Sequence, residues 1–209
     1  KFFANISKTS LTTIIFVYCD PNFNSDIEAC LRVLESGGLI LYPTDTIWGI
    51  GCDATNEQAV AKIYALKKRV ASKSMIVLIA DEKDLTKYVT QPNLQIFDYI
   101  KGVAKPTTVI YEGATGVANN LVNEDGSIAI RIVKDPFCRE LINLFGKPIV
   151  STSANLSGYP PPAIFNDIDA EIKNGVDYIV QHRQDDLHLA EPSAIIRWNN
   201  NGIPTIIRS

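Results

Sequence analysis

The sequence predicts an α/β fold built around one mixed sheet. Apolar runs of strand length alternate along the chain with segments that carry helix start and stop signals, a pattern typical of α/β proteins. The runs 193–197 and 203–208 follow each other without room for a crossover helix, so at least this pair should be antiparallel. At 209 residues, with 46% hydrophobic and 21% charged residues, the chain suits one large globular domain.

Strands are expected where short apolar runs are bounded by turn residues. The first run, 13–18, lies within residues 1–20, which we interpret as an N-terminal strand or extension because no small-residue cleavage pattern of a signal sequence is present. No run approaches the ~20 apolar residues that cross a membrane. The other strands are expected at 38–43, 75–80, 107–111, 127–133, 148–152, 177–181, 193–197 and 203–208.

Helices are expected between many of these strands. The clearest has Asp135 as N-cap, Pro136 at the first helical position and Gly146 as the stop. Another fits a capping box, with Thr55 as N-cap and Gln58 three residues later. The expected helices cover 25–36, 56–68, 92–101, 136–145 and 167–174.

Charge and cysteine content exclude some classes of function. The net charge of −3, from 20 Lys and Arg against 23 Asp and Glu, argues against a surface built mainly to hold a nucleic-acid backbone. The four cysteines form no CxxC pair and the chain has only two histidines, so neither a zinc site nor a disulfide framework is indicated. A reducing, cytoplasmic setting is therefore expected.

A first candidate site lies in the stretch LYPTDTIWGIGCDAT. Thr44, Asp45 and Thr46 leave an apolar strand, and Gly49 and Gly51 would let the backbone come close to a ligand or to another strand. A capped turn, with the threonine hydroxyls bonded to nearby backbone, explains the same residues equally well.

A second candidate site is a group of cations. Lys67, Lys68, Arg69 and Lys73 fall within seven residues and could neutralise phosphate or carboxylate groups, although such a run is usually a solvated helix end. Arg131 shares one face of its strand with small residues, which would suit a cleft floor or a solvated sheet face.

A third candidate site follows the strand at 148–152. Ser151, Ser153 and Asn155 offer hydroxyls and an amide which, together with turn N–H groups, could cradle phosphate oxygens or a carboxylate. A polar turn after a strand is the alternative. Neither histidine lies in a recognisable catalytic triad motif.

Taken together, these motifs resemble the YrdC/Sua5 family, whose short members are threonylcarbamoyl-AMP synthases. The resemblance covers about 170 residues from position 38, in the family's order, and it is strongest at STSANLSG. The chain ends at Ser209 without the extra C-terminal domain of long Sua5-type members, so it resembles the short form, a single YrdC-like domain over 1–209. The matching motifs are PTDTIWGIG, LKKR at 66–69, GSIAIRI at 126–132, STSANLSG at 151–158, PSAIIR at 192–197 and the terminal IIR at 206–208.

The resemblance implies a twisted sheet of parallel and antiparallel strands, with flanking helices, around a positively lined cleft. It implies a nucleotidyltransferase that condenses L-threonine, bicarbonate or CO2, and ATP into threonylcarbamoyl-AMP and pyrophosphate, for threonylcarbamoyladenosine (t6A) modification of tRNA by partner proteins. Mg2+ would come with ATP, and no structural metal is expected. The chain itself would bind RNA weakly or not at all, and would not bind a membrane.

The resemblance also implies a role for each matching residue. Lys67 and Arg69 would be the catalytic pair. Threonine and bicarbonate would be bound by Thr44, Thr46, Lys73 and Ser193. ATP would be bound by Lys67, Arg69, Thr108, Arg131, Ser151, Ser153, Asn155 and Arg208. Trp48 stands where the family usually has Tyr, and we expect it to form a wall of the pocket.

Two other functions remain open at this point. One is an RNA-binding module of the same fold, for double-stranded RNA, that uses the basic stretch 62–73; its affinity would fall steeply with salt. The other is a paralogue that makes a different acyl-adenylate, which the altered segment 103–106 mildly favours.

Overall fold

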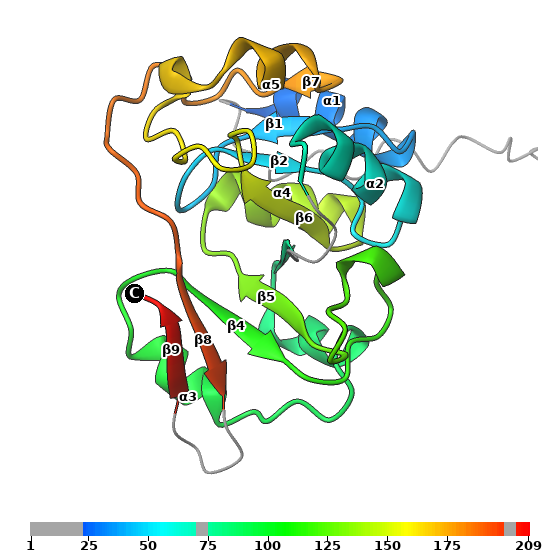
Figure 1. The fold of residues 1–209 in the computed structure, drawn as a ribbon, viewed down its shortest axis with the longest axis vertical. Coiled ribbons are helices and arrows are strands. Elements are labelled where there is room, and N and C mark those ends of the chain that lie inside the picture. Colours follow the sequence, from blue (N-terminus) through cyan, green and yellow to red (C-terminus); the bar gives the residue numbers. More distant parts are fainter. Residues whose placement is uncertain (1–22, 70–74, 199–203) are drawn as a thin grey trace, which may run out of the picture.

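The computed structural model describes residues 23–69, 75–198 and 204–209, and within these ranges it contains one mixed nine-stranded sheet (Figure 1). The strand predicted at 13–18 lies outside the described residues. The sheet order is β7-β1-β2-β6-β3-β5-β4-β8-β9. The strands are β1 (Ile40–Tyr42), β2 (Gly49–Gly51), β3 (Ile76–Ile79), β4 (Thr107–Tyr111), β5 (Ile128–Ile132), β6 (Ile149–Ser153), β7 (Tyr178–Ile179), β8 (Ala194–Trp198) and β9 (Pro204–Arg208).

The strand directions confirm the predicted mixed sheet. The pairs β1/β7, β3/β5 and β4/β8 are parallel, whereas β1/β2, β2/β6, β3/β6, β4/β5 and β8/β9 are antiparallel. The antiparallel β8/β9 pair is the one that the short spacing between the two runs predicts. A long connection that follows β7 passes down one side of the molecule to reach β8, and so links the two ends of the sheet (Figure 1).

Five α-helices lie against this sheet in the described part of the chain. Figure 1 places α1, α2, α4 and α5 around β1, β2, β6 and β7, and α3 beside β8 and β9. Three short 3-10 helices, η2, η3 and η4, cover 82–87, 119–121 and 165–167. The α-helices are α1 (Asn24–Glu35), α2 (Glu57–Leu66), α3 (Ile96–Lys101), α4 (Pro136–Phe145) and α5 (Ala170–Asn174). Over the same ranges, no helix combines the length and the apolar character needed to span a membrane.

The helix ends test the capping predictions directly. In α4 the prediction is confirmed, because Asp135 Oδ1 accepts a hydrogen bond from Cys138 N at 2.9 Å and Gly146 adopts a left-handed φ of 71°. In α2 the predicted N-cap is wrong. Asn56, not Thr55, caps the helix, because its Oδ1 accepts from the backbone N–H groups of the next turn at 3.0 and 3.1 Å. Thr55 instead donates to Asp53 Oδ1 through both its N–H and its hydroxyl.

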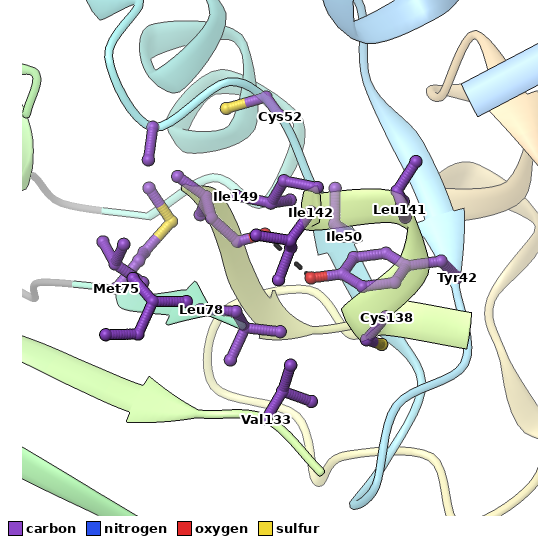
Figure 2. Packing of buried hydrophobic residues seen from close by; sticks show 14 of the residues in the cluster. Tyr42, Ile50, Cys52, Met75, Leu78, Val133, Cys138, Leu141, Ile142 and Ile149 are labelled. Atoms are coloured by element: carbon purple, nitrogen blue, oxygen red, sulfur yellow. Dashed lines mark hydrogen bonds between the residues drawn. The ribbon is translucent and has the colours of Figure 1, made fainter. Parts of the chain in front are cut away.

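Strand β2, which the sequence does not predict as a strand, explains the glycines in the first candidate stretch. A Cβ on Gly51 would lie 2.6 Å from Tyr42 Cε1 and 2.8 Å from the Val150 carbonyl oxygen. The glycine therefore lets β1, β2 and β6 pack closely in the hydrophobic core. Tyr42 lies across this contact and donates a hydrogen bond to the Val150 carbonyl at 3.0 Å, drawn as the dashed line in Figure 2.

Candidate functional site

A cavity of about 340 Å³ brings most of the predicted site residues together. It lies where β6, β5 and the ends of α2, β8 and β9 converge, so its lining comes from segments far apart in the sequence. The predicted residues that line it are Thr46, Lys67, Arg69, Arg131, Ser151, Ser153, Asn155, Ser193 and Arg208. Thr44 and Thr108 do not line it, and Lys73 lies outside the described residues.

The charge of the cavity is strongly one-sided. Lys67, Arg69, Arg131 and Arg208 all line it, and its described lining contains no Asp or Glu. Burial, and then the nearby charge of Arg131, lower the pKa of Arg208. Because cations so close together repel one another, this arrangement favours an anionic ligand that can lie between them.

Arg131 is the most deeply placed arginine of the cavity. It lies on β5, opposite Leu78 of β3, and its side chain is 3% exposed. Its Nη2 lies 3.0 Å from Asp45 Oδ1, which makes the two side chains an ion pair. The contact lacks hydrogen-bond geometry, so Nη2 and Nε of Arg131 have no hydrogen-bond partner among the described residues. Buried guanidinium donors without acceptors are rare, and beside a cavity they are suited to bind an anion.

Lys67 is buried, contrary to the solvated helix end that its sequence context also allowed. Its side chain is among the largest that are fully buried, and its ammonium group donates hydrogen bonds to the backbone carbonyls of Ser153 and Asn155. An ammonium group has three donors, so one remains for a ligand. Burial, and secondly the charge of Arg69, lower the pKa of Lys67 to about 7. The next cation, Lys68, is exposed and pairs with Glu171 at 2.7 Å.

The STSAN segment forms one wall of the cavity. Ser151 and Ser153 lie two residues apart on β6, which places both hydroxyls on the same side of the sheet. Asn155 Nδ2 donates to the carbonyls of Leu156 at 2.9 Å and Tyr159 at 2.6 Å, which holds the loop that follows. Asn155 lines the cavity, and its Oδ1 is buried without a hydrogen-bond partner in the described residues.

The two threonines of the first candidate stretch differ in position. Thr44 is 1% exposed, and its hydroxyl is used within the turn: it accepts from Thr46 N at 3.0 Å and donates to the Ile47 carbonyl at 2.8 Å. Thr46 is the one that lines the cavity. Trp48 packs against Phe165, with ring centroids 4.8 Å apart, and is not part of the lining, in contrast to the expected wall. The stretch therefore combines a capped turn with one side chain at the site.

Ser193 is held by two of the other predicted residues. Its hydroxyl lies 2.9 Å from the hydroxyl of Thr108 on the neighbouring strand, and its carbonyl accepts from Arg208 Nε at 3.0 Å and Nη2 at 2.8 Å. Thr108 itself is fully buried behind Ser193. The end of β9 and the interior of β4 thus fix the start of β8 at the cavity.

Sequence reasoning missed two features of the site. Asp45, the partner of Arg131, carried a signal, because it lies between the two threonines of a candidate motif. Tyr159 and Pro161 also line the cavity, with Tyr159 69% exposed, but the sequence indicated only a stiff loop there. Throughout the described ranges, no three His, Cys, Asp or Glu side chains gather in a way that could hold a metal ion.

Comparisons with known proteins give matches over most of the chain. A model of the Sua5/YciO/YrdC family, described as telomere recombination, matches residues 32–209. The threonylcarbamoyl-AMP synthase of Vibrio parahaemolyticus is 33% identical over 150 residues, which cover 70% of this chain and 81% of the relative.

Two solved structures show the same fold. Sua5 of P. abyssi, solved in complex with L-threonine, has a TM-score of 0.76 and 23% identity, over 88% of this chain. This chain spans 54% of the length of that protein. YciO of E. coli has a TM-score of 0.76 and 21% identity, over 88% of this chain and 89% of its own. At these identities, the two structures establish the fold alone.

Proposed function

Because the chain belongs to the Sua5/YciO/YrdC family, we propose that it is a threonylcarbamoyl-AMP synthase. The observation that carries the proposal is the cavity in which four cations meet without a carboxylate in the described lining. The reaction joins a carbamate to a polyphosphate, both of them anions, so fixed positive charge is what its transition state requires.

The proposed reaction has two steps. The amine of L-threonine first adds to CO2 and loses a proton, which gives the N-carboxylate. A carbamate oxygen then attacks the α-phosphorus of ATP, and the bond to the β-phosphate oxygen breaks to release pyrophosphate. Since the carbamate decomposes readily in water, the main task of the protein is to hold both reactants together in a closed site.

The proposed roles follow the position of each side chain. Arg131, with unused donors, and Lys67, with one donor left, bind the phosphates, and Arg69 lines the same cavity. Small hydroxyl side chains occupy other lining positions. Of these, Thr46 and Ser193 are assigned to threonine, whose carboxylate and hydroxyl they suit, and Ser151 and Ser153 to ATP. Thr108 and Thr44 act through their hydrogen bonds to Ser193 and Thr46.

Mg2+ enters this proposal as part of the substrate. The described lining offers no carboxylate, and Mg2+ prefers carboxylate and phosphate oxygens. The ion therefore arrives on the phosphates of ATP, where it neutralises charge that the four cations do not.

The enclosed position of Lys67 and the pairing of Lys68 favour this function over an RNA-binding module. An RNA surface needs cations that reach an extended backbone. Lys67 is instead enclosed in the cavity, and Lys68 is paired with Glu171. We therefore propose that t6A formation on tRNA is completed by partner proteins that receive the adenylate, without strong RNA binding by this chain.

The proposal is tested by pyrophosphate release from MgATP, with bicarbonate and threonine left out in turn. We expect release only when both are present, and little release with serine or valine. Release with threonine but without bicarbonate would indicate a simple aminoacyl-adenylate, and release with a different acid would indicate the paralogue. Affinity for double-stranded RNA that falls steeply with salt, without pyrophosphate release, would support the RNA-binding module instead.

A further inference from the structure

A second cavity, of about 440 Å³, lies beside the turn that carries Thr44, Asp45 and Thr46. It shares Thr46 and Pro192 with the first cavity, so the two cavities are neighbours. The connection between β7 and β8 forms its far side, and Arg183 of that connection lies in it opposite Thr44.

Arg183 joins three segments that are far apart in the sequence: its own connection, the turn that carries Thr44, and the N-terminus of α4. Its Nη2 donates to the Thr44 carbonyl at 2.8 Å, and its Nη1 donates to Asp135 Oδ2 at 2.6 Å. Asp135 follows β5, the strand of Arg131, and caps α4 through its other oxygen. Arg183 itself precedes β8 and Ser193 in the same connection.

The backbone conformation at Arg183 also indicates that its surroundings hold this residue in place. Its φ is +67°, in the left-handed region that a non-glycine residue adopts at a cost and keeps where the surroundings fix it. Two charge-assisted hydrogen bonds, to Asp135 and to the Thr44 carbonyl, provide that restraint in a partly buried setting. The contacts therefore hold the connection as well as the turn.

We propose that Arg183 is a positioning residue for the amino-acid end of the site. Its guanidinium group donates a hydrogen bond to the Thr44 carbonyl, and the Thr44 hydroxyl accepts one from the backbone N–H of Thr46. These two bonds keep Thr46 in place at the cavity. Arg183 does not line the first cavity, so it acts on the substrate through this turn. The assignment of threonine to Thr46 rests on the proposed function, whereas the restraint of the turn does not.

The left-handed backbone allows a clean test by chemical rescue. Arg183→Gly removes the side chain at a position where glycine is the preferred residue, and leaves a space that free guanidinium can enter. We expect kcat/KM for threonine to fall about tenfold, because a displaced contact group is costly, while KM for ATP changes much less. Guanidinium at low, non-denaturing concentration should restore most of the loss, and methylammonium should not.

A second readout needs no activity. Trp48 ends the same turn, so in a Trp198→Phe background it is the one tryptophan and reports on the order of the turn. We expect acrylamide to quench Trp48 more strongly in Arg183→Gly, and guanidinium to reverse this. Gln91→Gly is the matched control, since Gln91 is another non-glycine residue with a positive φ, of 53°, and does not line either cavity.

These readouts separate failure of the inference from failure of the proposed function. If the wild-type chain releases no pyrophosphate, the proposed function fails, but quenching of Trp48 still decides whether Arg183 restrains the turn. Unchanged quenching and unchanged threonine kinetics in Arg183→Gly would overturn the inference, as would a loss that guanidinium cannot reverse. Should Arg183→Gly not fold, Arg183→Lys keeps the charge but cannot bridge both acceptors, and it should show the same selective loss for threonine.

Discussion

The pKa of Lys67 makes its contribution to ATP binding depend on pH near neutrality. Burial, and then the charge of Arg69, lower this pKa to about 7, so the ammonium form is half populated at that pH. If the ammonium form binds the phosphates, ATP should bind less tightly as the pH rises above 7. Each pH unit should cost up to about tenfold in affinity, or ~1.4 kcal/mol, until the pKa of the complex is reached.

The same shift predicts how stability depends on pH. The folded pKa lies below the unfolded value of 10.5, so between about pH 7 and 10.5 the unfolded chain binds the proton that the folded chain has released. Stability should therefore rise with pH across this window, by about 1.5 kcal/mol between pH 7 and 8.5. Below pH 7 both states are protonated, and this contribution no longer changes.

Lys67→Met tests both statements, because methionine fills similar space without titrating. The assay is calorimetric binding of MgATP, together with urea unfolding, at pH 7 and 8.5 for wild type and variant. For each measurement, the free energy of the variant is subtracted from that of the wild type at the same pH, which removes the titration of ATP and of the other side chains. If neither the binding difference nor the unfolding difference changes with pH, the reasoning is refuted. That result would mean that the two carbonyl hydrogen bonds to the ammonium group offset its burial completely.

Three further substitutions test the packing and the second layer of the site. Gly51→Ala places a Cβ 2.6 Å from Tyr42 Cε1 and should lower the free energy of unfolding in urea by roughly 1–3 kcal/mol. An unchanged urea midpoint would show that β1 and β2 can move apart. Thr108→Val removes the hydroxyl partner of Ser193, so it should raise KM for threonine and lower the free energy of unfolding by ~1 kcal/mol. Unchanged kinetics would show that this contact has only a structural role. Lys68→Ala should leave both pyrophosphate release and the urea midpoint nearly unchanged, since its ion pair is exposed. A large loss of activity would contradict the distinction from Lys67.

Local sequence signals predicted the helices and strands best where the residues at their ends favour a single structural role. The predicted bounds of α4 match the structure because a capping Asp, a Pro in the first turn and a left-handed Gly mark its ends. Strand β4 also matches, at Thr107–Tyr111. Strand β2 was missed, because three residues between turns are too short to show an alternating pattern. The N-cap of α2 was predicted one residue too early because Thr55 and Asn56 are both good N-caps. In the structure Thr55 is hydrogen-bonded to Asp53, which leaves Asn56 to cap the helix.

The candidate site was predictable as a set of motifs but not as a geometry. A run of cations does not reveal that Lys67 is buried while Lys68, its neighbour, is exposed. Nor does the sequence show that Thr44 turns inward and Thr46 toward the cavity. Arg183 gave no signal at all, since its hydrogen bond to Thr44 joins residues 139 positions apart, in segments that only the folded sheet brings together.

The most direct test of the central claim is the mass of the nucleotide product. Incubation of the chain with MgATP, L-threonine and 13C-bicarbonate, followed by rapid quenching and mass spectrometry, should yield a mixed anhydride of AMP that carries threonine and one labelled carbon. Formation of that product, and its loss in Lys67→Met, is what the cation-lined cavity predicts. An unlabelled threonyl adenylate, or ADP and phosphate in place of threonylcarbamoyl-AMP and pyrophosphate, would contradict the account.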